Sequence, residues 1–117
     1  MHSIKAIRGA ITIVKNTELE IIDAMHRLLD AIEQQNPLLI PESIIAVWLT
    51  ATKDITAIFP TRVFQERGQK WRDVPRMCAQ EMDVYQALPF CIRIKILADL
   101  ADTPNHVYLE KAVALKA

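Results

Sequence analysis

The feature that most constrains the fold is a single long amphipathic segment among stretches typical of β-strands. Residues 18–34 carry apolar side chains at helical spacing, and Thr17 with Glu20 three positions later forms the pattern of a capping box. Asn36 and Pro37 predict the end of this helix, because the residue before a proline disfavours the α region. One long helix can cover only one face of a sheet. The other face is then expected to meet a second subunit or a ligand.

The strand-like stretches predict an α/β (α+β) fold in which a mixed β-sheet is packed by the long helix and one short helix. These stretches are residues 4–14, 43–50, 73–78, 90–98 and 106–109. Residues 43–50 are apolar on both faces, which predicts a strand covered on both sides. A short helix is expected over residues 61–67, and residues 81–88 are expected to form a loop with one helical turn. With no repeat or linker, residues 1–117 are expected to form a single domain.

Composition narrows the function classes. The apolar fraction of 51% is slightly above the usual globular range and favours a symmetric oligomer that covers the surplus apolar surface. Fourteen basic and fourteen acidic residues cancel, which argues against a nucleic-acid partner. No apolar run approaches the roughly 20 residues that span a bilayer, and no signal-peptide pattern is present. We therefore expect a cytoplasmic protein that binds neither nucleic acid nor membrane.

No metal site is expected from the sequence. The two cysteines and the three histidines lack the spacing of metal ligands. These residues are Cys78, Cys91, His2, His26 and His106.

Two arginines and one acid are the candidates for chemistry. Arg8 shares a strand face with small neighbours, and Arg93 alternates with isoleucines, so each guanidinium is expected to project from a strand on the face away from the core. A guanidinium matches a carboxylate bidentately, which favours a small organic anion as ligand. Glu81 follows directly after a strand, where ligands often bind. From the residues alone, ordinary surface ion pairs and a plain loop carboxylate remain open alternatives.

Five ordered segments make a more specific pattern and cover nearly the whole chain. The chain resembles the monofunctional chorismate mutases that form a trimeric pseudo-α/β-barrel, a class distinct from the all-helical chorismate mutases. The segments are Ala6-Ile7-Arg8-Gly9-Ala10, Ala57-Ile58-Phe59-Pro60, Cys78-Ala79-Gln80-Glu81-Met82-Asp83-Val84, Cys91-Ile92-Arg93, and His106-Val107-Tyr108-Leu109-Glu110-Lys111-Ala112-Val113.

The resemblance implies a homotrimeric isomerase without a cofactor that rearranges chorismate to prephenate, in phenylalanine and tyrosine biosynthesis, at sites between subunits. It implies that Arg93 points at the breaking ether bond, that Glu81 accepts a hydrogen bond from the ring hydroxyl, and that Arg8 grips a carboxylate. It further implies substrate contacts by four other residues: Tyr108 beside Arg8, Cys78 beside Glu81, Phe59 in the pocket wall, and Arg62 on the pocket rim.

Some positions depart from the family pattern. Gln65 stands where an arginine is usual, and Arg67 is a candidate to replace its charge. Arg62 stands where a lysine is usual and Lys116 where an arginine is usual, so the positive charge is kept at both positions. Met77 stands where a small polar residue is usual. These departures leave a second interpretation open, in which a trimer of the same architecture binds a small anion without catalysing a reaction.

Overall fold

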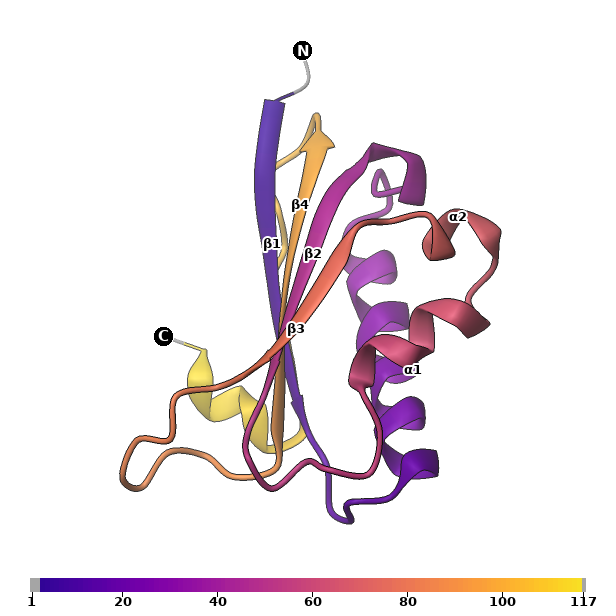
Figure 1. Cartoon of the computed structure of the whole chain (residues 1–117). Coiled ribbons are helices and arrows are strands. Elements are labelled where there is room, and N and C mark those ends of the chain that lie inside the picture. The colour runs from indigo at the N-terminus through magenta and orange to yellow at the C-terminus, as the bar shows by residue number, and fades with distance from the viewer. Residues whose placement is uncertain (1–2, 117) are drawn as a thin grey trace.

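The computed structural model describes residues 3–116 (Figure 1). His2, one of the histidines considered above, lies outside the described residues. The elements in chain order are β1 (Ser3–Thr12), α1 (Glu18–Gln35), η1 (Pro41–Ser43), β2 (Ile44–Ala51), η2 (Pro60–Glu66), α2 (Gln69–Arg72), β3 (Arg76–Gln80), β4 (Cys91–Leu100), β5 (Val107–Leu109) and η3 (Glu110–Leu115), where η marks a 3-10 helix.

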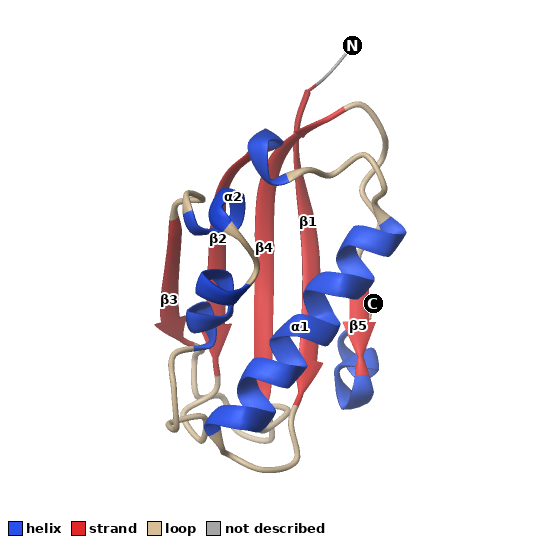
Figure 2. Ribbon diagram, turned by 90° about the vertical axis from the view of Figure 1, so that its right-hand side faces the viewer, coloured by secondary structure: helices blue, strands red, loops and turns tan. Residues whose placement is uncertain are grey.

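The strands form one five-stranded sheet in the order β3-β2-β4-β1-β5. The central strand β4 pairs antiparallel with both β1 and β2. The outer strand β5 runs parallel to β1, and the outer strand β3 runs parallel to β2. The predicted mixed sheet with one long helix is therefore confirmed. Figure 2 shows α1 lying obliquely across one face of this sheet.

Helix α1 begins and packs largely as its sequence pattern predicts. The Thr17 side chain accepts a hydrogen bond from the Glu20 backbone N–H at 3.2 Å, which is one half of the capping box. The Glu20 carboxylate binds the backbone N–H of Val14 at 2.8 Å instead of that of Thr17, so it fixes the turn that enters the helix. Full burial of one aliphatic side chain stabilises the folded state by about 1.5–3 kcal/mol. The fully buried face of α1 comprises Ile21, Ala24, Met25, Leu28, Leu29 and Ile32.

Gly9 allows the helix to lie close to the strand that carries Arg8. A Cβ at this position would stand 3.0 Å from Ile94 Cγ2, 3.1 Å from Ile32 Cδ1 and 3.2 Å from the carbonyl oxygen of Val107. Any larger residue must therefore push β4, α1 or β5 away. The tight contact fixes β1, and with it the positions of Arg8 and Ala10 on the opposite face.

That opposite face, here called the open face, is covered only in part. Figure 1 shows η3 on the side of the sheet away from α1, where Ala112 buries Ala10 and Cys91. Trp48 of β2 remains 42% exposed on the open face, next to Met77 of β3. The expectation that residues 43–50 are covered on both sides is therefore wrong within one chain, because residues 3–116 contain no second long helix.

Several predicted boundaries are shifted. The strand predicted over residues 73–78 begins at Arg76, because the unpredicted helix α2 ends with Asp73 as its C-cap. The short helix predicted over residues 61–67 is a 3-10 helix that stops before Gly68, whose φ of 100° an L-residue rarely adopts. The loop 81–88 contains a turn with Gln86 at a φ of 62° and no helical turn.

Candidate active site

Strand pairing brings the candidate residues of the open face into one row. Tyr108 lies beside Ala10, Ala10 beside Arg93, and Arg93 beside Thr50, each on the neighbouring strand. The small side chain of Ala10 leaves space between the tyrosine ring and the Arg93 guanidinium. In the next row Arg8 lies beside Lys95. Alternation along the strands thus places both predicted arginines on the same face, as expected.

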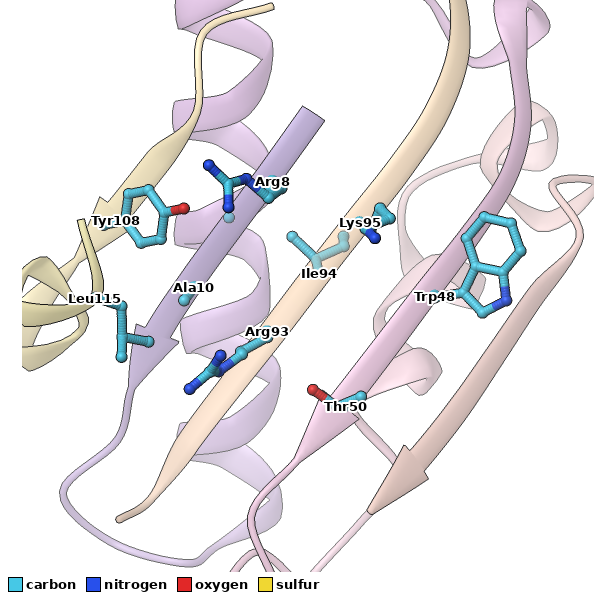
Figure 3. Close-up of a pocket in the computed structure, with 10 residues that line it drawn as sticks. Arg8, Ala10, Trp48, Thr50, Arg93, Ile94, Lys95, Tyr108 and Leu115 are labelled. Atoms are coloured by element: carbon cyan, nitrogen blue, oxygen red, sulfur yellow. The ribbon is translucent and has the colours of Figure 1, made fainter. Parts of the chain in front are cut away.

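These rows line a cavity of about 590 Å³. Figure 3 shows the side chains of Arg8, Arg93 and Tyr108 on the same side of the sheet. Leu115 of η3 and Trp48 of β2 also line the cavity, so its walls come from the C-terminal segment and from the far strand. The volume is ample for a small organic acid.

Glu81 is held next to Arg93 by three contacts. Its backbone N–H donates to the Ala51 carbonyl at 2.9 Å, which continues the β3 pairing past the end of the strand. The Thr50 hydroxyl donates to Glu81 Oε2 at 2.6 Å, and Arg93 Nε lies 3.6 Å from the same oxygen. Oε2 therefore makes both of these side-chain contacts, and Oε1 remains available to accept a hydrogen bond. Thr50 was not singled out from the sequence, although its alternation with Trp48 places it on the open face.

The charge in this cavity favours an anion. Arg8, Arg93 and Lys95 are its cations, and Glu81, at its edge, is the adjoining carboxylate. Within residues 3–116, neither Arg8 nor Lys95 has a carboxylate at ion-pairing distance. The ordinary surface ion pair that would explain Arg8 without a ligand is absent from this part of the chain.

His106 fixes the backbone of Arg8. The Arg8 backbone N–H donates to His106 Nδ1 at 2.9 Å, so the neutral ring carries its proton on Nε2. Burial, and then the positive charge of Arg8, lower the pKa of His106 below its ordinary value. Sequence reasoning set His106 aside as a metal ligand, and its backbone contact was not foreseen because the two residues are 98 positions apart.

This contact predicts a loss of stability on acidification. Because the folded-state pKa of His106 is depressed, its contribution is full above about pH 6.5 and is lost as the pH falls toward the folded value. We expect His106→Asn, whose amide oxygen accepts the same hydrogen bond at every pH, to show a smaller fall in melting temperature between about pH 7 and about pH 5. The check is calorimetry across this range. Equal pH slopes for the two proteins would contradict the role of His106.

The other predicted residues lie elsewhere. Phe59 and Cys78 line a second cavity of about 610 Å³, bounded by β3 and the loop that follows β2. Cys78 packs against the core on the helix side of the sheet. Burial raises the pKa of the Cys78 thiol, which keeps it neutral and able to donate a hydrogen bond. Arg62 lies further along the same side and shares a smaller cavity with Phe59.

The predicted site residues of one chain therefore form two groups on opposite faces of its sheet, here called half-sites because the family resemblance implies sites between subunits. Arg8, Arg93 and Tyr108 belong to the open face, with Glu81 beside them, whereas the second half-site lies on the helix side at the sheet edge. A single chain does not bring the seven predicted residues together. The helix-side residues are Phe59, Arg62 and Cys78.

Arg67 does not replace the charge that Gln65 lacks. Its guanidinium forms ion pairs with Asp30 and Glu33 of α1, and its side chain is only 12% exposed. It also lies over the Trp71 ring, with Cζ 5.8 Å from the ring centroid. Arg67 thus fastens the segment after η2 to α1, and the expectation that it serves the pocket is wrong.

The described residues contain no group of three or more His, Cys, Asp or Glu side chains placed to hold a metal ion. Among the helices of residues 3–116, none has the length and apolar character needed to cross a membrane.

Comparison with known proteins identifies the family. Residues 4–117 match the family model for chorismate mutase type I. Chorismate mutase AroH of Bacillus subtilis (strain 168) is 40% identical to the chain over 117 residues, covering 97% of this chain and 90% of that protein. Chorismate mutase AroH of Thermus thermophilus is 36% identical, covering 97% of this chain and 93% of that protein.

The fold agrees with these matches. The solved structure of a chorismate mutase from Clostridium thermocellum superposes with a TM-score of 0.88 at 34% identity, covering 94% of this chain and 98% of that one. The resemblance inferred from the ordered motifs is therefore confirmed, and so is the predicted fold class. By its sequence match, its mixed sheet and its cation-lined cavity, the chain belongs to the chorismate mutase type I family.

Proposed function

We propose that this protein rearranges chorismate to prephenate in a pocket that is completed between subunits of a homotrimer. The single observation that carries this proposal is the Glu81–Arg93 pair at the edge of a cavity that also holds Arg8 and Tyr108. A cavity with this excess of positive charge suits a dianion, and the family membership names the reaction. The step belongs to the synthesis of phenylalanine and tyrosine, and we expect the enzyme to act in the cytoplasm.

The reaction requires the enzyme only to position the substrate and to stabilise a developing charge. The rearrangement is pericyclic: the carbon–oxygen ether bond breaks while a carbon–carbon bond forms within one molecule, without a nucleophile, a proton transfer or a cofactor. The enzyme must hold the flexible substrate in its compact conformer, which lowers the entropic part of the barrier. It must also stabilise the negative charge that grows on the ether oxygen as that bond stretches.

Arg93 is the residue we assign to that oxygen. Strand β4 fixes its backbone between β1 and β2, and its ion pair with Glu81 Oε2, at 3.6 Å, is made by Nε and not by the terminal nitrogens. A cation directed at the ether oxygen binds the transition state more strongly than the substrate, which is the condition for raising kcat. A guanidinium suits this role because its charge is permanent and its donors are planar.

Arg8, Tyr108 and Glu81 hold the substrate. The Arg8 guanidinium and the Tyr108 hydroxyl are assigned to one substrate carboxylate, on the side of the cavity away from Thr50. Glu81 Oε1 is assigned to the ring hydroxyl as a hydrogen-bond acceptor. Because no proton is transferred in the reaction, Glu81 positions the ring and does not act as a base.

The exposed apolar surface supports subunit contact. Ile4, Trp48 and Met77 lie on the open face and are 55%, 42% and 62% exposed. Clusters of exposed large apolar residues mark interaction sites. A neighbouring copy that covers this face and supplies its own Phe59, Cys78 and Arg62 would unite the two half-sites, and repeating this head-to-tail contact three times closes a ring.

An assay with purified protein tests the activity. The expected result is loss of the chorismate absorbance and formation of prephenate, at the same rate before and after treatment with a chelator. Absence of turnover at micromolar protein, together with a chorismate-induced rise in melting temperature, would instead support an anion-binding trimer without catalysis.

A further inference from the structure

A second pair of arginines lies beside the helix-side half-site. Arg62 of η2 and Arg76 of β3 line one cavity of about 250 Å³ together with Phe59 and Gln65. Phe59 also lines the larger cavity that contains Cys78. The two cavities therefore meet at the Phe59 side chain, and both arginines stand at the margin of the half-site. Nothing in the sequence pattern had singled out Arg76.

The Arg76 guanidinium is held in place and is only partly used. Its Nη1 donates to the carbonyl oxygens of Arg72 at 3.0 Å and Val74 at 3.2 Å, and its Cζ lies 5.5 Å from the centroid of the Phe64 ring. A guanidinium has five N–H donors, of which Nη1 provides two. The Nε and Nη2 edge is left free, and this edge forms the planar fork that binds a carboxylate bidentately.

Neither of these arginines is neutralised within the described chain. No carboxylate of residues 3–116 lies at ion-pairing distance from Arg62 or Arg76. Glu66 lines an adjoining cavity with both of them, but it forms no ion pair with either. Arg67 is committed to the acids of α1. Two guanidinium groups without an ion-pair partner among residues 3–116, of which that of Arg76 is held by backbone carbonyls, are suited to an organic carboxylate.

We propose that Arg76, together with Arg62, binds a carboxylate of the substrate and thereby supplies the positive charge that Gln65 does not. This inference rests on the proposed function, in which chorismate lies between the open face of one subunit and the helix side of the next. Chorismate carries two carboxylates. One is assigned to Arg8 and Tyr108, and Arg76 gives the second a cation from the neighbouring subunit. Because this carboxylate is present in substrate and transition state alike, Arg76 contributes mainly to binding.

Steady-state kinetics of Arg76→Ala test the proposal. Loss of a charge-assisted contact is expected to raise KM by about 10- to 100-fold while kcat stays within about threefold. Lys70→Ala is the matched control. This variant removes one positive charge from the neighbouring helix α2. Lys70 pairs with Glu42 and does not line either of the cavities that contain Arg76. KM of this control is expected to change by less than about twofold.

A rescue separates binding from structural support. Gln65 lines the same cavity as Arg76, so Gln65→Arg in the Arg76→Ala background is expected to bring KM back to within about threefold of the wild-type value. If Arg76 only braced Phe64, an arginine at position 65 would not restore binding. If the alanine variant does not fold, Arg76→Lys replaces it, with a smaller rise in KM and the same rescue.

The outcomes are distinguishable. An unchanged KM in Arg76→Ala, or a KM that Gln65→Arg fails to restore, overturns the role of Arg76 and leaves the proposed function standing. A wild-type protein that does not convert chorismate overturns both.

Discussion

Replacing Arg93 with alanine is expected to lower kcat by about 10³-fold while KM changes by less than about tenfold. Arg93 Nε lies 3.6 Å from the Glu81 carboxylate, and we propose that its terminal nitrogens face the ether oxygen. The charge on that oxygen is small in the substrate and large in the transition state. Removal of the cation therefore acts on turnover far more than on binding.

Two further variants sharpen this prediction. Arg93→Lys keeps a charge but loses the planar fork, so we expect about a 10²-fold loss of kcat. Lys70→Ala removes an exposed cation of α2 that pairs with Glu42 and does not line the cavity of Arg93, and kcat should stay near the wild-type value. Thermal unfolding of each variant controls for damage to the fold. Equal losses in kcat and in chorismate affinity would show that Arg93 only binds the substrate.

Local patterns predicted those parts of the structure that depend on near neighbours. The apolar spacing after Thr17 located α1, because helical periodicity and the cap are properties of adjacent residues. The alternation Ile92-Arg93-Ile94 placed Arg93 away from the core, because the side chains of a strand point to opposite faces in turn. The same rule put Arg8 and Arg93 on one face once their strands were paired.

Contacts between distant segments were not predictable in this way. Arg67 was expected in the pocket, yet it pairs with Asp30, which is 37 positions earlier. The sequence pattern does not reveal which acids of α1 will face η2. Likewise, a binding role for Arg76 is indicated only by the cavity that it shares with Arg62 and Phe59. The separation of the two half-sites depends on which face of the sheet α1 covers.

The division into half-sites makes a second large effect measurable. Arg93→Ala disables the open face of a chain, whereas the double variant Phe59→Ala with Arg62→Ala disables its helix side. Each protein alone is expected to be nearly inactive, because every pocket in the proposed trimer lacks one half. In a mixed trimer, some pockets combine the intact open face of one chain with the intact helix side of another.

Activity of this mixture tests the shared active site most directly. The two inactive variants are unfolded together at equal concentration, refolded, and assayed for chorismate turnover beside each variant refolded alone. Random assembly gives each pocket two independent choices of chain, so about one quarter of the pockets should be intact, and activity should rise from near zero to about one quarter of the wild-type value. Activity that stays at the level of the separate variants would contradict a pocket built from two subunits.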